Sequence, residues 1–354
     1  MPALDYDSFR RSVKKGEVLP AYYFHGDEDL LKDDAIRQVL EVAVEPSSRD
    51  FNLDRRRAAD LSADDFWSLT LTPPMLAERR AIVITEVESI QQRRQKSQAL
   101  RAALLKYLGS PSPQSVLVLV QSSGEKNDPE VARAATTVAF EPLAPDRLRR
   151  WIRHRAEQEG LEIDDDGARH LHEAVGDDLP QLAAEISKLR SAVTGRVATA
   201  SDVSDMVGIR RGETAYDFVD AVTARRIAAA ADMIAHLLES PGNSGVRLVT
   251  ALGTALTGLA LARALLDQGT PRGAIARQLG GAIAAARPMG LRGWNEEAER
   301  WAGDATHWSA AELERALAEL LRADRRLKSA ALGGEKEILT GAVLAMAGSA
   351  SAAA

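Results

Sequence analysis

Four short apolar runs, separated by longer amphipathic stretches, constrain the first 141 residues of this chain more than any other feature. Hydrophobicity within the runs is continuous rather than alternating, which is typical of strands covered on both faces in a parallel sheet. The stretches 30–44 and 98–108 between them have helical spacing. Strands alternating with helices predict an α/β layer domain. The runs are Ala21–Phe24, Ala81–Ile84, Val116–Val120 and Thr137–Phe140.

Beyond residue 141 the pattern is that of helices alone. Pro142 and Pro145 interrupt the chain and predict a domain boundary near 141. Gly176 stands where a helix should end, and Asp177 or Asp178 is placed to cap the next one. A second break near 210 precedes helices joined by short loops, which predict a bundle-like α domain. We therefore expect an α/β domain over 1–141, a small helical domain over 142–210, a larger helical domain over 211–347 and a frayed tail over 348–354.

The composition excludes several classes of protein. The 354 residues contain no cysteine, so disulfides, thiolate nucleophiles and cysteine metal sites are excluded, and a cytoplasmic location is expected. A net charge of −6 argues against a protein that coats nucleic acid by bulk electrostatics. The start of the chain does not have the pattern of a signal peptide. The uncharged stretch Leu248–Ala262 is shorter than the roughly 20 residues of a membrane span, and is expected to be a buried core helix.

An α/β domain suggests nucleotide binding, but the sequence lacks the chemistry for it. A phosphate loop needs glycines for close backbone approach, a lysine for the phosphates and a hydroxyl for magnesium, and no G-x-x-x-x-G-K-[ST] occurs. After the first strand, Gly26 is followed by the carboxylates of Asp27, Glu28 and Asp29. These charges would repel a triphosphate. We expect neither a nucleotide cofactor nor intrinsic ATPase activity.

Other catalytic chemistry is missing as well. Among the six histidines only His170 and His172 are close, and two positions apart on a helix they point to nearly opposite sides. His172 is expected to be a satisfied core residue, and Asp164–Asp166 to form a solvated turn and helix cap. No G-x-S-x-G nucleophile elbow is present. The sequence therefore predicts no catalytic residue and no metal site.

Several motifs follow one another along nearly the whole chain. Ala21–Leu31 is a strand followed by glycine, acids and a leucine pair, Asp50–Leu53 reads D-F-N-L, and Leu71–Ile84 runs through a proline pair and two arginines into a strand. This ordered set, which continues through 143–151, 164–189, 216–219 and 320–329, resembles the delta subunits of the bacterial DNA polymerase III clamp loader.

The resemblance implies a degenerate AAA+ type module, with a parallel-sheet α/β domain and a small helical lid-like domain, followed by a helical collar domain. It also implies a function without nucleotide turnover. Such a subunit binds the beta sliding clamp and favours its open form, while ATP is used by sister subunits. The implied partners are the clamp, the gamma or tau and delta-prime subunits, and primer-template DNA through the complex. Any DNA-directed DNA polymerase activity would be that of the holoenzyme.

The resemblance also implies a clamp-binding site at Pro74, Met75 and Leu76. In the family an apolar pair before the second strong strand enters a pocket on the clamp. The typical pair includes phenylalanine, and this sequence has methionine and leucine instead, although methionine fills irregular pockets well. The alternative from the residues alone is that Met75 and Leu76 cover the sheet edge.

Two arginine-rich stretches are candidates for DNA contact. Arg149 and Arg153 lie within 147–155, and the other stretch is Arg55–Arg57. Solvated helix faces are the alternative explanation for both.

Two other classes of protein compete with this interpretation. One is a loader ATPase or a catalytically inactive delta-prime-like subunit, but these usually carry a cysteine zinc module and an S-R-C motif, which a chain without cysteine cannot have. The other is a helical scaffold or regulator, although no helix-turn-helix with a basic recognition helix is evident.

Overall fold

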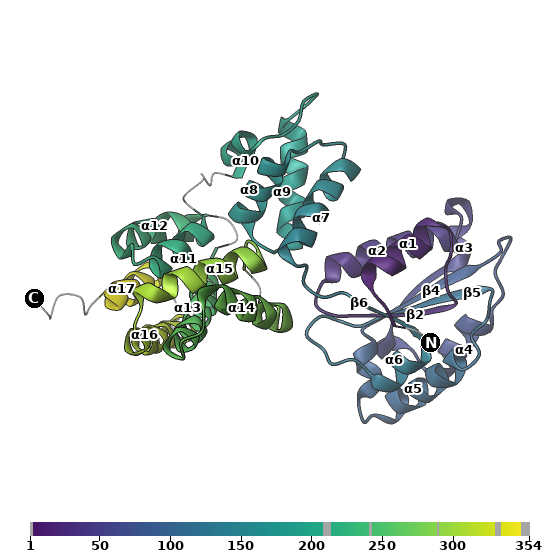
Figure 1. Ribbon diagram of the computed structural model, residues 1–354. Coiled ribbons are helices and arrows are strands. Elements are labelled where there is room, and N and C mark those ends of the chain that lie inside the picture. The colour runs from purple at the N-terminus through teal and green to yellow at the C-terminus, as the bar shows by residue number, and fades with distance from the viewer. Residues whose placement is uncertain (1–2, 208–213, 241–242, 289, 330–333, 348–354) are drawn as a thin grey trace, which may run out of the picture. The chain divides into compact units, whose positions relative to one another are not determined.

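The computed structural model describes residues 3–207, 214–240, 243–288, 290–329 and 334–347. The chain divides into two compact units, Met1–Pro142 and Leu143–Ala354, which are labelled by element in Figure 1. The boundary expected near 210 and the tail expected over 348–354 lie outside the described residues, so the subdivision of the second unit remains a prediction.

Within the described residues, six parallel strands form one sheet in the first unit, in the order β1-β6-β2-β5-β4-β3. Helices α1 and α2 cover one face, and α4, α5 and α6 cover the other (Figure 1). The strands are β1 Ala3–Leu4, β2 Ala21–His25, β3 Leu53–Arg57, β4 Arg80–Thr85, β5 Ser115–Val120 and β6 Thr136–Ala139. The α/β class predicted from the continuous apolar runs is confirmed, because each run lies in one of these strands, except that Phe140 directly follows β6.

Both faces of the sheet are buried, as the continuous hydrophobicity requires. Tyr23 packs with Phe66 and Tyr107 in the core on the α4 and α5 side. Its neighbours Tyr22 and Phe24 contact Phe9 of α1 with ring centroids 5.6 and 5.3 Å apart. Successive residues of one strand thus supply two cores, because their side chains alternate between the faces.

Strand β3 was not predicted, and it corrects the alternative that Arg55–Arg57 form a solvated helix face. Arg55–Arg57 belong to this edge strand, where they are exposed, rather than to a solvated helix face. Backbone pairing with β4 makes the segment a strand although its side chains are charged. Charged side chains on an edge strand also discourage pairing with other chains.

The helices of the first unit alternate with its strands. They are α1 Tyr6–Lys14, α2 Asp29–Ala43, η1 Pro46–Ser48, α3 Arg49–Asn52, η2 Ala58–Asp60, α4 Ala63–Leu71, η3 Val87–Gln91, α5 Gln95–Leu108 and α6 Pro129–Ala134, where η marks a 3₁₀ helix.

The described part of the second unit is helical apart from one parallel bridge between Ile163 and Ala198. As predicted, Gly176 ends α8 and the side chain of Asp178 caps α9, accepting from Gln181 N. The helices are α7 Pro145–Gln158, α8 Asp165–Val175, α9 Leu179–Ala192, α10 Ala200–Val207, α11 Ala215–Thr223, α12 Ile227–Glu239, α13 Gly245–Asp267, α14 Arg272–Ala286, α15 Trp294–Asp304, η4 Ala305–His307, α16 Ala310–Ser329 and α17 Glu335–Ala347.

Helix α13 is the central core helix of the second unit. Leu248, Leu252, Leu256 and Leu259 are fully buried in the cluster that α11, α15, α16 and α17 share. In the part of the chain that the structure describes, α13 is the one helix with the length and apolar composition of a membrane span, and 44% of its most apolar window is buried. The expectation of a buried core helix over 248–262 agrees with this packing.

Candidate partner-binding site

The loop between α4 and β4 carries the predicted clamp-binding residues. Ser62 and Asp65 form a capping box that starts α4, and the fully buried Phe66 anchors that helix on the core. The helix ends at Leu71, because Pro73 and Pro74 cannot donate the backbone hydrogen bonds of a further turn. Residues 72–79 therefore leave the helix as an irregular loop that must be held by side chains from other segments.

Asn52 provides one of these attachments. Its side-chain amide faces the backbone of Met75, accepting from Met75 N at 2.7 Å and donating to Met75 O at 2.8 Å. The same amide nitrogen donates to Ser48 O at 3.2 Å, and the Asn52 side chain is fully buried. The buried amide thus bonds both the backbone N–H and the backbone carbonyl of Met75, as a neighbouring strand would.

Arg80 provides the second attachment at the base of the loop. Its guanidinium donates to Thr72 O at 3.1 Å and pairs with the carboxylate of Asp54 on the neighbouring strand β3. Only 4% of the Arg80 residue is exposed, so this charge-assisted contact is shielded from water. The start of the loop is therefore fixed to the sheet, and its middle is fixed to the end of α3.

The loop presents apolar side chains to solvent. Leu76 is 96% exposed and Met75 is 55% exposed, whereas Pro74 is half-buried. The backbone of Leu76 has a φ of 53°, a left-handed conformation that is unfavourable for leucine. Because Leu76 remains in solvent, the alternative that this pair covers the sheet edge does not account for it.

Two further apolar residues, next in the chain to Asn52 and to Thr72, are also exposed. Phe51, next to Asn52, is 64% exposed, and Leu71, the last residue of α4, is 71% exposed. Together with Met75 and Leu76 they are the four most exposed large apolar side chains among the described residues. The D-F-N motif was the available signal for Phe51, since asparagine after it makes the contact to Met75.

The carboxyl edge of the sheet, where a nucleotide would bind in an α/β domain, is closed by Lys32. Its ammonium donates to Gly26 O after β2 at 2.8 Å and to Gln121 O after β5 at 2.7 Å. It also pairs with Asp29 at 2.6 Å, and the Lys32 side chain is 1% exposed. An ammonium has three donors, and all three have acceptors here. Lys32 therefore cannot donate a hydrogen bond to a phosphate without breaking one of these contacts.

The predicted carboxylates join this closure. Asp27 accepts from Gly124 N at 2.9 Å, and Asp29 accepts from the Ser123 hydroxyl at 3.0 Å. These bonds tie the loop after β5 to the loop after β2. Nearby, burial raises the pKa of Tyr23 to about 12, so that its hydroxyl stays protonated while it donates to the side chain of Gln121.

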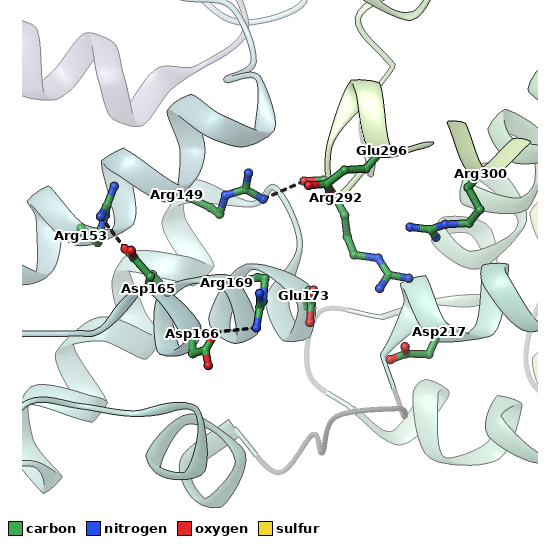
Figure 2. A pocket seen from close by; sticks show the side chains of 11 residues that line it. Arg149, Arg153, Asp165, Asp166, Arg169, Glu173, Asp217, Arg292, Glu296 and Arg300 are labelled. Atoms are coloured by element: carbon green, nitrogen blue, oxygen red, sulfur yellow. Dashed lines mark hydrogen bonds and ion pairs between the residues drawn. The ribbon is translucent and has the colours of Figure 1, made fainter. Parts of the chain in front are cut away.

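Arg149 and Arg153, the candidate DNA-facing residues, line a pocket of the second unit (Figure 2). Arg149 pairs with Asp146 and donates to Arg292 O at 3.1 Å, and Arg153 pairs with Asp165 at 2.5 Å. Both guanidiniums thus have partners within the chain.

The rest of the pocket is also internally neutralised. Arg169 pairs with Asp166 at 2.6 Å, and Arg292 and Arg300 both bind the carboxylate of Asp220. Arg300 also lies 3.5 Å from the buried carboxylate of Glu297. Burial raises the pKa of Glu297 to about 7, although Arg300 opposes the shift.

The histidines have structural contacts. His172 is buried, and its Nε2 lies 2.8 Å from Asp177 Oδ1 and 3.2 Å from the Tyr216 hydroxyl. His170, also buried, lies 2.9 Å from the Ser204 hydroxyl. The prediction that His172 is a core residue is confirmed, but the residue is not fully satisfied, because its buried Nδ1 has no hydrogen-bond partner within the described part of the chain. Among the described residues, no group of three or more histidine, aspartate or glutamate side chains is placed to hold a metal ion.

Comparison with known proteins identifies the relatives of this fold. The family model described as DNA polymerase III, delta subunit, matches residues 22–136. A curated DNA polymerase III subunit delta from Bacillus subtilis is 25% identical over 225 residues, which are 61% of this chain and 65% of that protein. The chain thus matches just under two thirds of the length of this relative.

A solved structure agrees with the sequence matches. The Bacillus subtilis DNA clamp loader delta protein superposes with a TM-score of 0.55 at 20% identity, covering 96% of this chain and 98% of that one. At this identity the likeness shows a shared fold, and it extends over both units. The sequence resemblance, the family model and the fold agree: residues 22–136 match the DNA polymerase III delta subunit family, and the chain shares the fold of a clamp loader delta protein.

Proposed function

We propose that this chain acts in a bacterial clamp loader as the subunit that binds the beta sliding clamp through Met75 and Leu76 and favours the open form of the ring. Pro74 stiffens the chain before the pair. Of the interpretations left open by the sequence, the family match favours the delta subunit over a delta-prime-like subunit or a helical scaffold.

The observation that carries the proposal is a fully exposed leucine on an anchored loop. Leu76 is 96% exposed although Asn52 and Arg80 hold the loop in place. An apolar side chain presented in this way loses water when it enters a pocket on a partner. Burial of Met75 and Leu76 would contribute roughly 3–6 kcal/mol before the costs of association.

Binding of this kind can drive a conformational change without nucleotide turnover in this chain. A ligand that prefers the open form of a strained ring shifts the ring toward that form by the difference in its two affinities. The closure of the strand edge by Lys32 is consistent with a subunit that leaves ATP to its neighbours. The proposal therefore separates clamp binding from ATP hydrolysis.

The remaining parts of the proposal concern the assembly. The helices of the second unit would join the gamma or tau and delta-prime subunits in a collar, in the cytoplasm, and primer-template DNA would be reached through that complex. Direct DNA contact by Arg149 and Arg153 has less support than clamp binding. Each arginine already pairs with a carboxylate, which a DNA phosphate would have to replace. Their replacement by glutamine should reduce the salt dependence of DNA binding by the assembled loader.

Binding to the purified clamp tests the central claim. Met75→Ser together with Leu76→Ser should weaken binding at least about tenfold, since the pair is expected to supply most of the apolar contact. Val42→Ser is the matched control, because Val42 is another exposed apolar residue of the same unit, on α2. Unchanged affinity of the double variant would show that the site has been assigned to the wrong residues.

Ring opening needs a separate measurement. A clamp labelled with fluorophores on both sides of one subunit interface should show increased separation on adding the wild-type chain, and no change with the double variant. Tight binding without any separation would contradict the opening step while leaving clamp binding intact.

A further inference from the structure

The buried side chain of Asn52 joins two segments of the chain through hydrogen bonds to their backbones. Its side-chain oxygen accepts from Met75 N, and its nitrogen donates to Met75 O and to Ser48 O. The oxygen and the nitrogen of the amide are both engaged, and the residue is fully buried. These bonds join the end of α3 to a loop 23 residues further along the chain.

This contact holds the residue directly before a leucine with a strained backbone. Leu76 follows the bonded residue directly and has a left-handed backbone with φ 53°. A non-glycine residue adopts this conformation at a cost, and keeps it only where the surroundings determine it. Asn52 fixes Met75 on one side, and Arg80 fixes Thr72 at the base of the loop. The exposed tip is therefore ordered before any partner arrives.

Preorganisation of this kind has a consequence for binding. A flexible loop loses conformational entropy when a partner orders it, whereas a loop that is already ordered avoids that loss. The affinity of the tip should accordingly depend on Asn52, although Asn52 is buried and cannot itself touch a partner.

The same contact brings in an aromatic residue. Phe51 precedes Asn52 and is 64% exposed, and the bonds of Asn52 keep the backbones of residues 52 and 75 adjacent. Exposed aromatic side chains dominate the energetics of many protein interfaces. The Met75–Leu76 pair has no aromatic ring, and Phe51 is placed to supply one from a different segment.

We infer that Asn52 is a positioning residue that preorganises the Met75–Leu76 tip for an apolar pocket of the sliding clamp, and that Phe51 adds the aromatic contact to this surface. The inference rests on the proposed function and deepens it. Its surface is composite, since it combines the end of α3 with the loop after α4.

Variants of Asn52 test the positioning role against clamp binding. Asn52→Leu removes every bond to Met75 and should weaken binding about tenfold or more. Asn52→Asp keeps the acceptor for Met75 N but loses the donors, so its affinity should lie between those of the wild type and Asn52→Leu. Hydrogen exchange of the Met75 amide, measured in the free chain, should quicken in the same order.

A double-mutant cycle distinguishes positioning from general destabilisation. In the Met75→Ser, Leu76→Ser background, Asn52→Asp should have no further effect on clamp binding, because there is no tip left to position. If the Met75 amide exchanges faster in Asn52→Asp and Asn52→Leu while both retain wild-type affinity, Asn52 does not act as inferred.

Phe51 is tested with a matched pair of substitutions. Phe51→Ser should weaken clamp binding about tenfold, and Phe51→Tyr, which keeps the ring, should bind as the wild type does. Wild-type affinity of Phe51→Ser would exclude the aromatic contact. Both results are separable from the proposed function: if Met75→Ser with Leu76→Ser abolishes binding, the clamp site stands even where the roles of Asn52 and Phe51 fail.

Discussion

The ammonium of Lys32 lies 2.7 Å from the carbonyl oxygen of Gln121, and this contact links helix α2 to the end of strand β5 at the edge where an α/β domain would hold a nucleotide. The residues are 89 positions apart in the sequence. Lys32 also donates to Gly26 O, so its side chain joins the loop after β2 to the loop after β5. Its role in this chain is structural.

Lys32→Met should destabilise the first unit by about 2–4 kcal/mol, because two buried carbonyls and the carboxylate of Asp29 lose their partner. Chemical denaturation monitored by tryptophan fluorescence, with Trp67 as the probe of this unit, measures the change. Lys126→Met is the control: Lys126 is exposed in the loop after β5, and its loss should cost less than about 0.5 kcal/mol. Equal stability of both variants would contradict the structural role.

Mg-ATP should not stabilise the wild-type chain. Any ligand that binds the folded state raises the unfolding temperature by mass action, and a closed strand edge with carboxylates beside Lys32 gives a triphosphate no site. Thermal unfolding with millimolar Mg-ATP should therefore match unfolding without it. A clear upward shift, or ATP turnover by the isolated chain, would refute the closed-edge interpretation.

Gly258→Ala should destabilise the second unit by about 2–3 kcal/mol, because overpacking in a buried helix contact forces its neighbours to move. A Cβ at position 258 of α13 would lie 2.1 Å from Cε3 of Trp301 in α15, and this ring is itself buried. Thermal denaturation of the full chain measures the effect.

Gly253→Ala on the same helix is the control. A Cβ there meets Leu320 Cδ2 at 3.5 Å, an ordinary contact, so alanine should be neutral or stabilise the helix by up to about 1 kcal/mol. Similar losses at both positions would show that the close approach of α13 and α15 at Gly258 is not what matters.

Glu297 should make the stability of the second unit fall as the pH rises. Burial raises the pKa of this carboxyl from 4.5 to about 7 in the folded chain. The folded state thus binds the proton that the unfolded state has already lost between pH 4.5 and 7. The free energy of unfolding decreases across this window and levels off above it, by about 3 kcal/mol for this group at most.

Glu297→Gln should flatten that dependence, because glutamine does not ionise. Unfolding free energies measured at pH 5 and pH 8 should differ less in this variant than in the wild type. Glu296→Gln, a substitution at an exposed neighbour whose charge is a minor cause of the raised pKa of Glu297, should change the difference much less. An unaltered pH profile in Glu297→Gln would mean that the carboxyl does not titrate in this range.

The sheet shows which strands can be predicted from the local pattern of apolar residues and which cannot. The four continuous apolar runs were sufficient to predict β2, β4, β5 and β6, because strands buried on both faces need apolar residues at every position. Strand β3 escaped prediction because its residues Asp54–Arg57 are charged, and it is a strand through backbone pairing at the edge. Pairing with a distant neighbour leaves no hydrophobic signal in the sequence.

The candidate site divides in a similar way. The sequence by itself determined the alternation of layers and the lack of a phosphate loop, since each depends on residue types within short segments, whereas the choice of Met75–Leu76 came from the resemblance to a family. Only the tertiary structure decided that Asn52 holds Met75 and that Lys32 reaches Gln121. The physical reason is that these side chains bond to backbone atoms, which every residue has. The partner's residue type therefore carries no signal in the sequence, and the fold alone decides which backbone lies within reach.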